Sequence, residues 1–102
     1  MWNKPSISEL KNVPDLYSSE NVSCKDKLIY LHFFIGGSDW YIAEIDHSDF
    51  DLMFGYCILN DDLEMAEWGY VSLSELDSIS VRGIEVDRDL HWSPVAFRQL
   101  RI

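Results

Sequence analysis

Residues 67–76 read Glu-Trp-Gly-Tyr-Val-Ser-Leu-Ser-Glu-Leu, and this stretch joins a strand signal to a helix signal. Trp68 and Tyr70 favour an extended strand, because aromatic side chains suit a pleated, half-buried surface. Ser72 and Glu75 stand three positions apart, the spacing of a capping box at the start of a helix. The stretch therefore predicts a strand that runs directly into a helix.

Upstream of this junction, two apolar runs predict a β-hairpin. Leu28–Ile35 and Asp39–Asp46 flank Gly36-Gly37, which suits a two-residue turn. Both faces of the hairpin are largely apolar, so we expect other parts of the chain, or a partner, to cover them. A turn at the two glycines sets the expected register, which pairs Phe33 with Trp40, His32 with Tyr41, Leu31 with Ile42, Tyr30 with Ala43, Ile29 with Glu44 and Leu28 with Ile45.

Further runs extend the sheet. Leu52–Leu59 and Met65–Val71 predict two more strands, and Gly55 in the first of them suits a bulge. Ile84–Trp92 alternates apolar and polar side chains and predicts an edge strand with one solvated face. Together with the hairpin, these runs predict a twisted antiparallel sheet of four to five strands.

Three short helices accompany the sheet. Ser6 and Glu9 have capping-box spacing, and Ser93-Pro94 is typical of a helix start. The fold class that these signals predict is α+β, as expected when strand runs cluster and helices are interspersed. We expect a single domain over residues 1–102, made of an N-terminal helix and connector (1–27), the sheet with one inserted helix (28–92) and a C-terminal helix (93–102).

Composition and charge argue against several functional classes of protein. The 102 residues are 47% hydrophobic, enough for a core without staples. The net charge of −10 argues against direct binding of nucleic acid or of an anionic membrane. Cys24 and Cys57 lie far apart and fit no metal-ligand spacing, and the apolar run Leu28–Gly37 is too short to cross a bilayer. A cytoplasmic protein with reduced thiols and no cofactor is the resulting expectation.

Six segments are distinctive: Leu16–Glu20, Lys25–Ile29, Trp40–Glu44, Phe54-Gly55, Glu67–Leu76 and Glu85–Trp92, with Gly69-Tyr70, Ser72 and Glu75-Leu76 as the most specific part. Together these segments resemble an uncharacterised bacterial family, domain of unknown function 2958. Its members are small proteins often carried by plasmids and integrative elements, so the resemblance implies a bacterial cytoplasm and a mobile-element setting. It implies no activity, cofactor or catalytic residue.

Two acidic clusters with histidine could support a small enzyme or a metal-binding domain. In Asp46–Asp51, three carboxylates and His47 fall within six residues, but the spacing fits no EF-hand register. Along Glu85–His91, alternate carboxylates would share one strand face. A solvated turn explains the first cluster, and charges that discourage edge pairing explain the second. We therefore expect no metal site and no catalytic residue, and keep the enzyme or metal-binding domain as the alternative.

Nucleophilic chemistry finds little support in the sequence. A thiol enzyme would need Cys57 beside a base such as His32, but Cys57 lies in mid-strand and no positive charge surrounds it. His32 is expected to be a satisfied sheet histidine. Ser72 and Ser93 are expected to cap helices, since no nucleophile-elbow motif surrounds either.

The distribution of charge supplies the leading functional hypothesis. No Lys or Arg occurs between Lys27 and Arg82, so the middle of the chain carries charge of one sign. This field could serve only solubility, or it could meet a basic, nucleic-acid-handling or defence protein as an imitation of nucleic acid. The predicted function is a non-enzymatic acidic interaction protein, with Trp68 or Tyr56 adding apolar contact. The expected partner-binding residues are Asp46, Asp49, Asp51, Asp61, Asp62, Glu64 and Glu67.

Self-association is a separate expectation. The hairpin carries apolar side chains on both faces, and exposed apolar patches usually mark interfaces. We expect a weak or moderate homodimer with Tyr30, Tyr41 or Phe34 near the contact.

Overall fold

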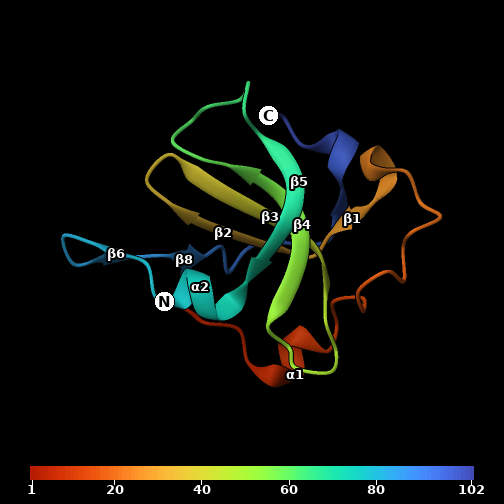
Figure 1. Cartoon of the computed structure of the whole chain (residues 1–102), viewed down its shortest axis with the longest axis horizontal. Helices are drawn as coiled ribbons and strands as arrows, with labels where there is room; N and C mark the ends of the chain where they lie inside the picture. Colours follow the sequence, from red (N-terminus) through yellow and green to blue (C-terminus); the bar gives the residue numbers. More distant parts are fainter.

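A five-stranded antiparallel sheet forms the centre of the computed structural model, which describes all residues 1–102 (Figure 1). The α+β class is confirmed, with two short helices and two 3-10 turns. The sheet order is β5-β4-β3-β2-β8, from β2 (Leu31–Ile35), β3 (Ser38–Ile45), β4 (Leu52–Ile58), β5 (Glu67–Ser72) and β8 (Asp87–Arg88). The other elements are α1 (Ile7–Leu10), η1 (Cys24–Asp26), β1 (Leu28–Ile29), α2 (Leu73–Asp77), β6 (Ser80–Val81), β7 (Ile84–Glu85), β9 (Val95–Ala96) and η2 (Phe97–Gln99).

Both predicted capping boxes are present. The Ser72 hydroxyl accepts a hydrogen bond from the Glu75 N–H at 3.1 Å, and the Glu75 carboxylate accepts from the Ser72 N–H. Ser6 and Glu9 make the same reciprocal pair at the start of α1. Helices of four and five residues are marginal alone, so packing against the sheet must hold them. No helix is both long and apolar enough to span a bilayer.

The predicted hairpin register is confirmed over its inner part. Phe33 pairs with Trp40, and the pairing continues to Leu31–Ile42. Beyond that point the prediction is wrong, because Leu28–Ile29 forms a separate strand, β1, which pairs with β9 and not with β3. The C-terminal segment thereby supplies backbone partners that the first strand would otherwise have taken from β3.

A β-bulge lies in β3 and not at Gly55, where the sequence predicted it. Ile42 is opposite Gly55 and Glu44 is opposite Phe54, so Ala43 is the extra residue. A Cβ at Gly55 would overlap the Tyr41 carbonyl oxygen, so the absence of a side chain permits this close approach. The bulge also shifts the alternation of β3 by one residue, which moves the Glu44 side chain to the other face of the sheet.

Two apolar clusters cover the two faces of the sheet, as the apolar pattern of the hairpin requires. The larger cluster joins the sheet to α1 and α2, with Phe33 and Met53 fully buried at its centre. The smaller one contains Tyr41 and Ile58 and packs against the C-terminal segment through Phe97. Figure 1 shows both α-helices at the lower side of the sheet and the C-terminal segment above.

Two sequence predictions near the C-terminus are wrong. Residues 93–102 form no α-helix, because Val95–Ala96 pairs with β1 and only the turn η2 follows. Backbone pairing and docking of Phe97 on the sheet outweigh the helix start signal at Ser93-Pro94. Ile84–Trp92 is likewise not one strand, since β7 pairs with β6 in a separate hairpin and β8 pairs with β2 (Figure 1).

Candidate functional site

The structure separates the expected partner-binding residues into two groups. Asp46–Asp51 forms the β3–β4 loop at one end of β4, and residues 59–66 form the β4–β5 loop at the other end. A strand of seven residues is about 20 Å long, so the two loops do not form one patch. Glu67 begins β5, is exposed and lies opposite Cys57.

Carboxylates of the β3–β4 loop are engaged by the fold itself. Asp46 accepts hydrogen bonds from the hydroxyl and N–H of Ser48 at 2.6 and 2.8 Å, which lower the pKa of Asp46. Asp49 accepts from the Asp51 N–H at 2.8 Å. Asp51 in turn accepts from the N–H and hydroxyl of Ser74 at 2.8 and 2.9 Å, in the first turn of α2. These bonds close a tight loop and cap a helix, in agreement with the turn interpretation.

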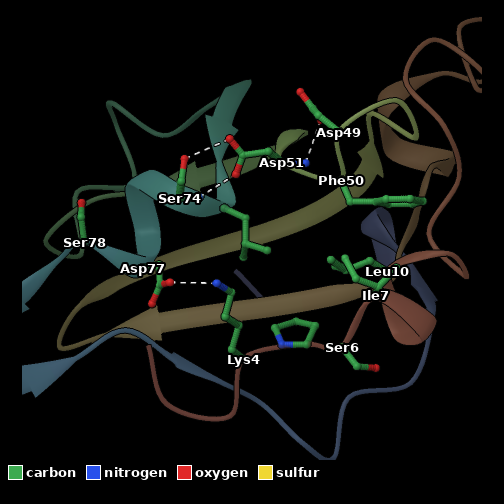
Figure 2. A pocket seen from close by; sticks show the side chains of 12 residues that line it. Lys4, Ser6, Ile7, Leu10, Asp49, Phe50, Asp51, Ser74, Asp77 and Ser78 are labelled. Carbon is green, nitrogen blue, oxygen red and sulfur yellow. Dashed lines mark hydrogen bonds and ion pairs between the residues drawn. The ribbon is translucent and has the colours of Figure 1, made fainter.

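A hollow of about 730 Å³ lies between this loop and the two helices (Figure 2). Figure 2 shows Asp51 directed at Ser74 and Lys4 directed at Asp77. The Lys4–Asp77 ion pair is 2.9 Å long, and the N-terminal ammonium also bonds to Asp77. These two cations lower the pKa of Asp77. Lys4 and the N-terminal ammonium thus compensate the charge of Asp77 and tie the N-terminal segment to α2, whereas Asp49 and Asp51 accept hydrogen bonds from uncharged donors.

The second acidic cluster is dispersed. Glu85 accepts from the N-terminal ammonium, and Asp87 accepts from the Asn3 side chain at 2.8 Å. Asp89 accepts from the His91 N–H at 2.9 Å. No three side chains among His, Cys, Asp and Glu are grouped so that they could hold a metal ion. The shared strand face on which this hypothesis depended does not form.

His32 lies among aromatic rings on the face of the sheet that carries the smaller cluster. Its ring stacks on Tyr41 with centroids 4.6 Å apart, and its Nε2 lies 2.7 Å from Asp39. Its Nδ1 is buried with no hydrogen-bond partner, so the histidine is only half satisfied. Cys57 pairs with Trp40 on the opposite face, and burial raises the pKa of its thiol. A Cys–His nucleophilic pair is therefore absent.

The β4–β5 loop carries three exposed carboxylates, one of which, Asp62, accepts a hydrogen bond from the Met65 N–H at 3.3 Å. Asp61, Asp62 and Glu64 are all exposed. The loop also exposes three apolar side chains, with fractional exposures of 52% for Leu59, 59% for Leu63 and 75% for Met65. Carboxylates and unburied apolar side chains thus share one short loop.

The buried ion pair between Lys27 and Glu44 was not predicted from the sequence. Lys27 and Glu44 are 7% and 3% exposed, and their charged atoms lie 3.8 Å apart. Glu44 accepts from the Tyr17 N–H at 2.9 Å and from the Ser19 N–H and hydroxyl. Lys27 donates to the Ser19 carbonyl at 2.5 Å and to its hydroxyl at 2.8 Å. A carboxylate inside an apolar strand was the available signal, but the bulge that turns it toward Lys27 leaves no clear mark in the sequence.

The Lys27–Glu44 pair forms the floor of a hollow of about 320 Å³. Three aromatic rings line it, from Tyr17 in the connector, Phe54 on β4 and Tyr70 on β5. Tyr17 and Tyr70 are 58% and 55% exposed, so the hollow has an aromatic, accessible rim.

The fold and these sites define a small acidic α+β domain with an open acidic loop and an aromatic hollow over a buried ion pair. The family model described as "Protein of unknown function (DUF2958)" matches residues 9–98, and the chain belongs to that family. No curated protein and no solved structure matches the chain.

Proposed function

We propose that the protein is a non-enzymatic interaction protein of a mobile element, which binds a basic nucleic-acid-handling or defence protein through its β4–β5 loop. The observation that carries this proposal is the composition of the loop. Asp61, Asp62 and Glu64 are exposed there beside Leu63 and Met65. Carboxylates steer a basic partner and set its orientation, whereas apolar side chains supply area to bury.

Rigidity at the base of the loop supports the proposal. The Asn60 N–H donates to the Ser38 hydroxyl at 3.1 Å, and the Asp61 N–H donates to the Gly37 carbonyl at 2.8 Å. Asn60 and Asp61 are both in the left-handed region, which their short polar side chains tolerate. The loop is thus fastened to the β2–β3 turn, and a preordered loop loses less conformational entropy on binding.

Charge over the rest of the chain agrees with a basic partner. The net charge is −10, and the interval between Lys27 and Arg82 has no Lys or Arg. Proteins that hold nucleic acid carry Lys and Arg to meet phosphates, so an acidic surface can occupy their clefts. A cytoplasmic setting in a bacterial host follows from the mobile-element interpretation of the family. The β3–β4 loop contributes less to binding in this proposal, because its carboxylates already cap and close the fold.

The experiment is capture of partners from a bacterial host lysate by the wild-type protein and by two loop variants. The Asp61→Asn, Asp62→Asn, Glu64→Gln variant removes three charges and keeps residue types that tolerate the local backbone. Its charge-conserving control is Asp62→Glu with Glu64→Asp. We expect the control to retain a basic nucleic-acid-handling partner and the triple variant to lose most of it. Equal capture by all three proteins would refute the role of the loop.

The apolar half of the loop is tested separately. Leu63→Ser with Met65→Ser should weaken capture, whereas Val81→Ser with Leu90→Ser should not. The control residues are 56% and 58% exposed and belong to other segments, Val81 to β6 and Leu90 to the turn that follows β8. Loss of binding in both double variants would point to general surface apolarity and not to this loop.

A further inference from the structure

We propose that the hollow between Tyr17, Phe54 and Tyr70 binds the side chain of an arginine from a basic peptide. This inference goes beyond the β4–β5 loop, because it names a second site with its own ligand. The hollow opens at the margin of the sheet, since β5 is an edge strand and contributes Tyr70. A peptide can therefore approach it without displacing any element of the fold.

Aromatic rings and carboxylates suit a guanidinium group. Phe54 and Tyr70 lie with ring centroids 5.2 Å apart at 54°, and Tyr17 completes the rim. A planar guanidinium stacks on aromatic faces and donates to carboxylates from the same group of atoms. Glu20 supplies an exposed carboxylate at the lining of the hollow, and Glu44 adds negative charge from below, although its oxygens already accept from Tyr17 and Ser19.

Local charge favours a cation over an anion. Glu20 and Glu44 carry two negative charges and Lys27 one positive charge, so the lining has a net charge of −1. The Lys27 ammonium already donates to the carbonyl and hydroxyl of Ser19. An anion would face two carboxylates and a cation that is already engaged. A hydrogen bond with Tyr17 and desolvation, with smaller contributions from Glu44 and Glu20, raise the pKa of the Tyr70 hydroxyl.

Three costly local features converge on this hollow. The bulge at Ala43 turns Glu44 to this face, and Tyr17 holds a left-handed backbone with φ 67°, which is unfavourable for a bulky residue. A buried ion pair is not a strong source of stability compared with an apolar core. Strained and charged features that persist together cluster at binding sites, where they fix groups before the ligand arrives.

The test uses small probes and isotope-labelled protein. N-acetyl-arginine amide, N-acetyl-lysine amide and N-acetyl-glutamate amide are titrated while backbone amide resonances are followed. We expect the arginine probe to give saturable shifts at residues 17–20, 44, 54 and 70, with weaker binding of the lysine probe and none of the glutamate probe.

Two matched variants assign the charge contribution. Glu20→Gln should weaken arginine binding about two- to fivefold, the effect of one exposed ion pair. Glu75→Gln removes the same charge from α2, keeps the capping box because Gln can replace Glu at that position, and should leave arginine binding unchanged. Tyr70→Ala should weaken binding by a similar factor, because one face of the stack is lost.

Absence of saturable shifts with arginine would overturn the assignment. Equal effects of Glu20→Gln and Glu75→Gln would also overturn it, since only the net charge of the protein would then matter. Tighter binding of the lysine probe would overturn the choice of arginine. These outcomes are independent of partner capture by the loop, so failure of one proposal leaves the other standing.

Discussion

Replacement of Lys27 by methionine removes the positive half of the buried ion pair and keeps a side chain of similar length. Coulomb's law at an effective dielectric constant of about 20 gives about 4 kcal/mol for unit charges 3.8 Å apart. Glu44 keeps its hydrogen bonds from the Tyr17 N–H and from Ser19, which reduces the loss. We therefore expect about 3 kcal/mol of destabilisation, at the lower end of the range for breaking a buried pair.

Urea unfolding followed by tryptophan fluorescence measures this effect for Lys27→Met. A loss of about 3 kcal/mol corresponds to a melting temperature lower by about 12 to 24 °C in a domain of this size. Lys25→Met is the matched control, because Lys25 is exposed on η1 two residues away and should change stability by less than about 0.5 kcal/mol. Equal, small effects of both substitutions would refute the view that the pair fastens the connector to the sheet.

Three further predictions concern the sheet, its acid stability and its surface. Gly55→Ala should destabilise the protein by about 1–3 kcal/mol in urea unfolding, because its Cβ would overlap the Tyr41 carbonyl, whereas Gly69→Ala meets no atom within 4 Å and should be tolerated. The Arg88 guanidinium lowers the pKa of Glu9 from 4.5 to about 2, so the stabilisation of the folded state by ionised Glu9 is complete above about pH 4.5 and is lost as the pH falls toward 2. The melting temperature of Glu9→Gln should therefore decline less steeply across that window than the melting temperature of the wild type. An equally steep decline would contradict this. Self-association remains a prediction, and because Tyr41 is buried, the expected contact is formed by Phe34 or Tyr30. Sedimentation that shows only monomer at high protein concentration would exclude the homodimer.

Local signals in the sequence predicted the parts of the fold that local chemistry decides. The capping boxes at Ser6 and Ser72 and the hairpin register around Phe33–Trp40 depend on neighbouring residues and on a short turn. The departure of β1 to pair with β9 depends on residues almost seventy positions apart, as Leu28 opposite Ala96 shows. No periodicity in either segment specifies such a partner, and the terminal helix prediction failed for the same reason.

The candidate sites also divide into one that local signals predict and one that depends on residues distant in the sequence. Turn chemistry correctly suggested that Asp46 and its neighbours close a loop, because an Asp-x-Ser spacing makes local hydrogen bonds. The hollow over Lys27 and Glu44 brings together the connector, β3, β4 and β5, and it exists only because a bulge reverses the side of one residue. Alternation along the strand placed Glu44 on the wrong face, so the site could not have been predicted from the sequence.

Recognition of a basic partner by the β4–β5 loop is the central claim, and the salt dependence of that complex tests it most directly. The captured partner is titrated with the wild-type protein from low to high salt, with and without duplex DNA as competitor. We expect the affinity of the partner for the wild-type protein to fall steeply with salt, and we expect DNA to displace the protein from the partner. Both the salt dependence and the competition by DNA should be smaller for the Asp61→Asn, Asp62→Asn, Glu64→Gln variant. Affinity that is independent of salt, DNA and these substitutions would contradict it.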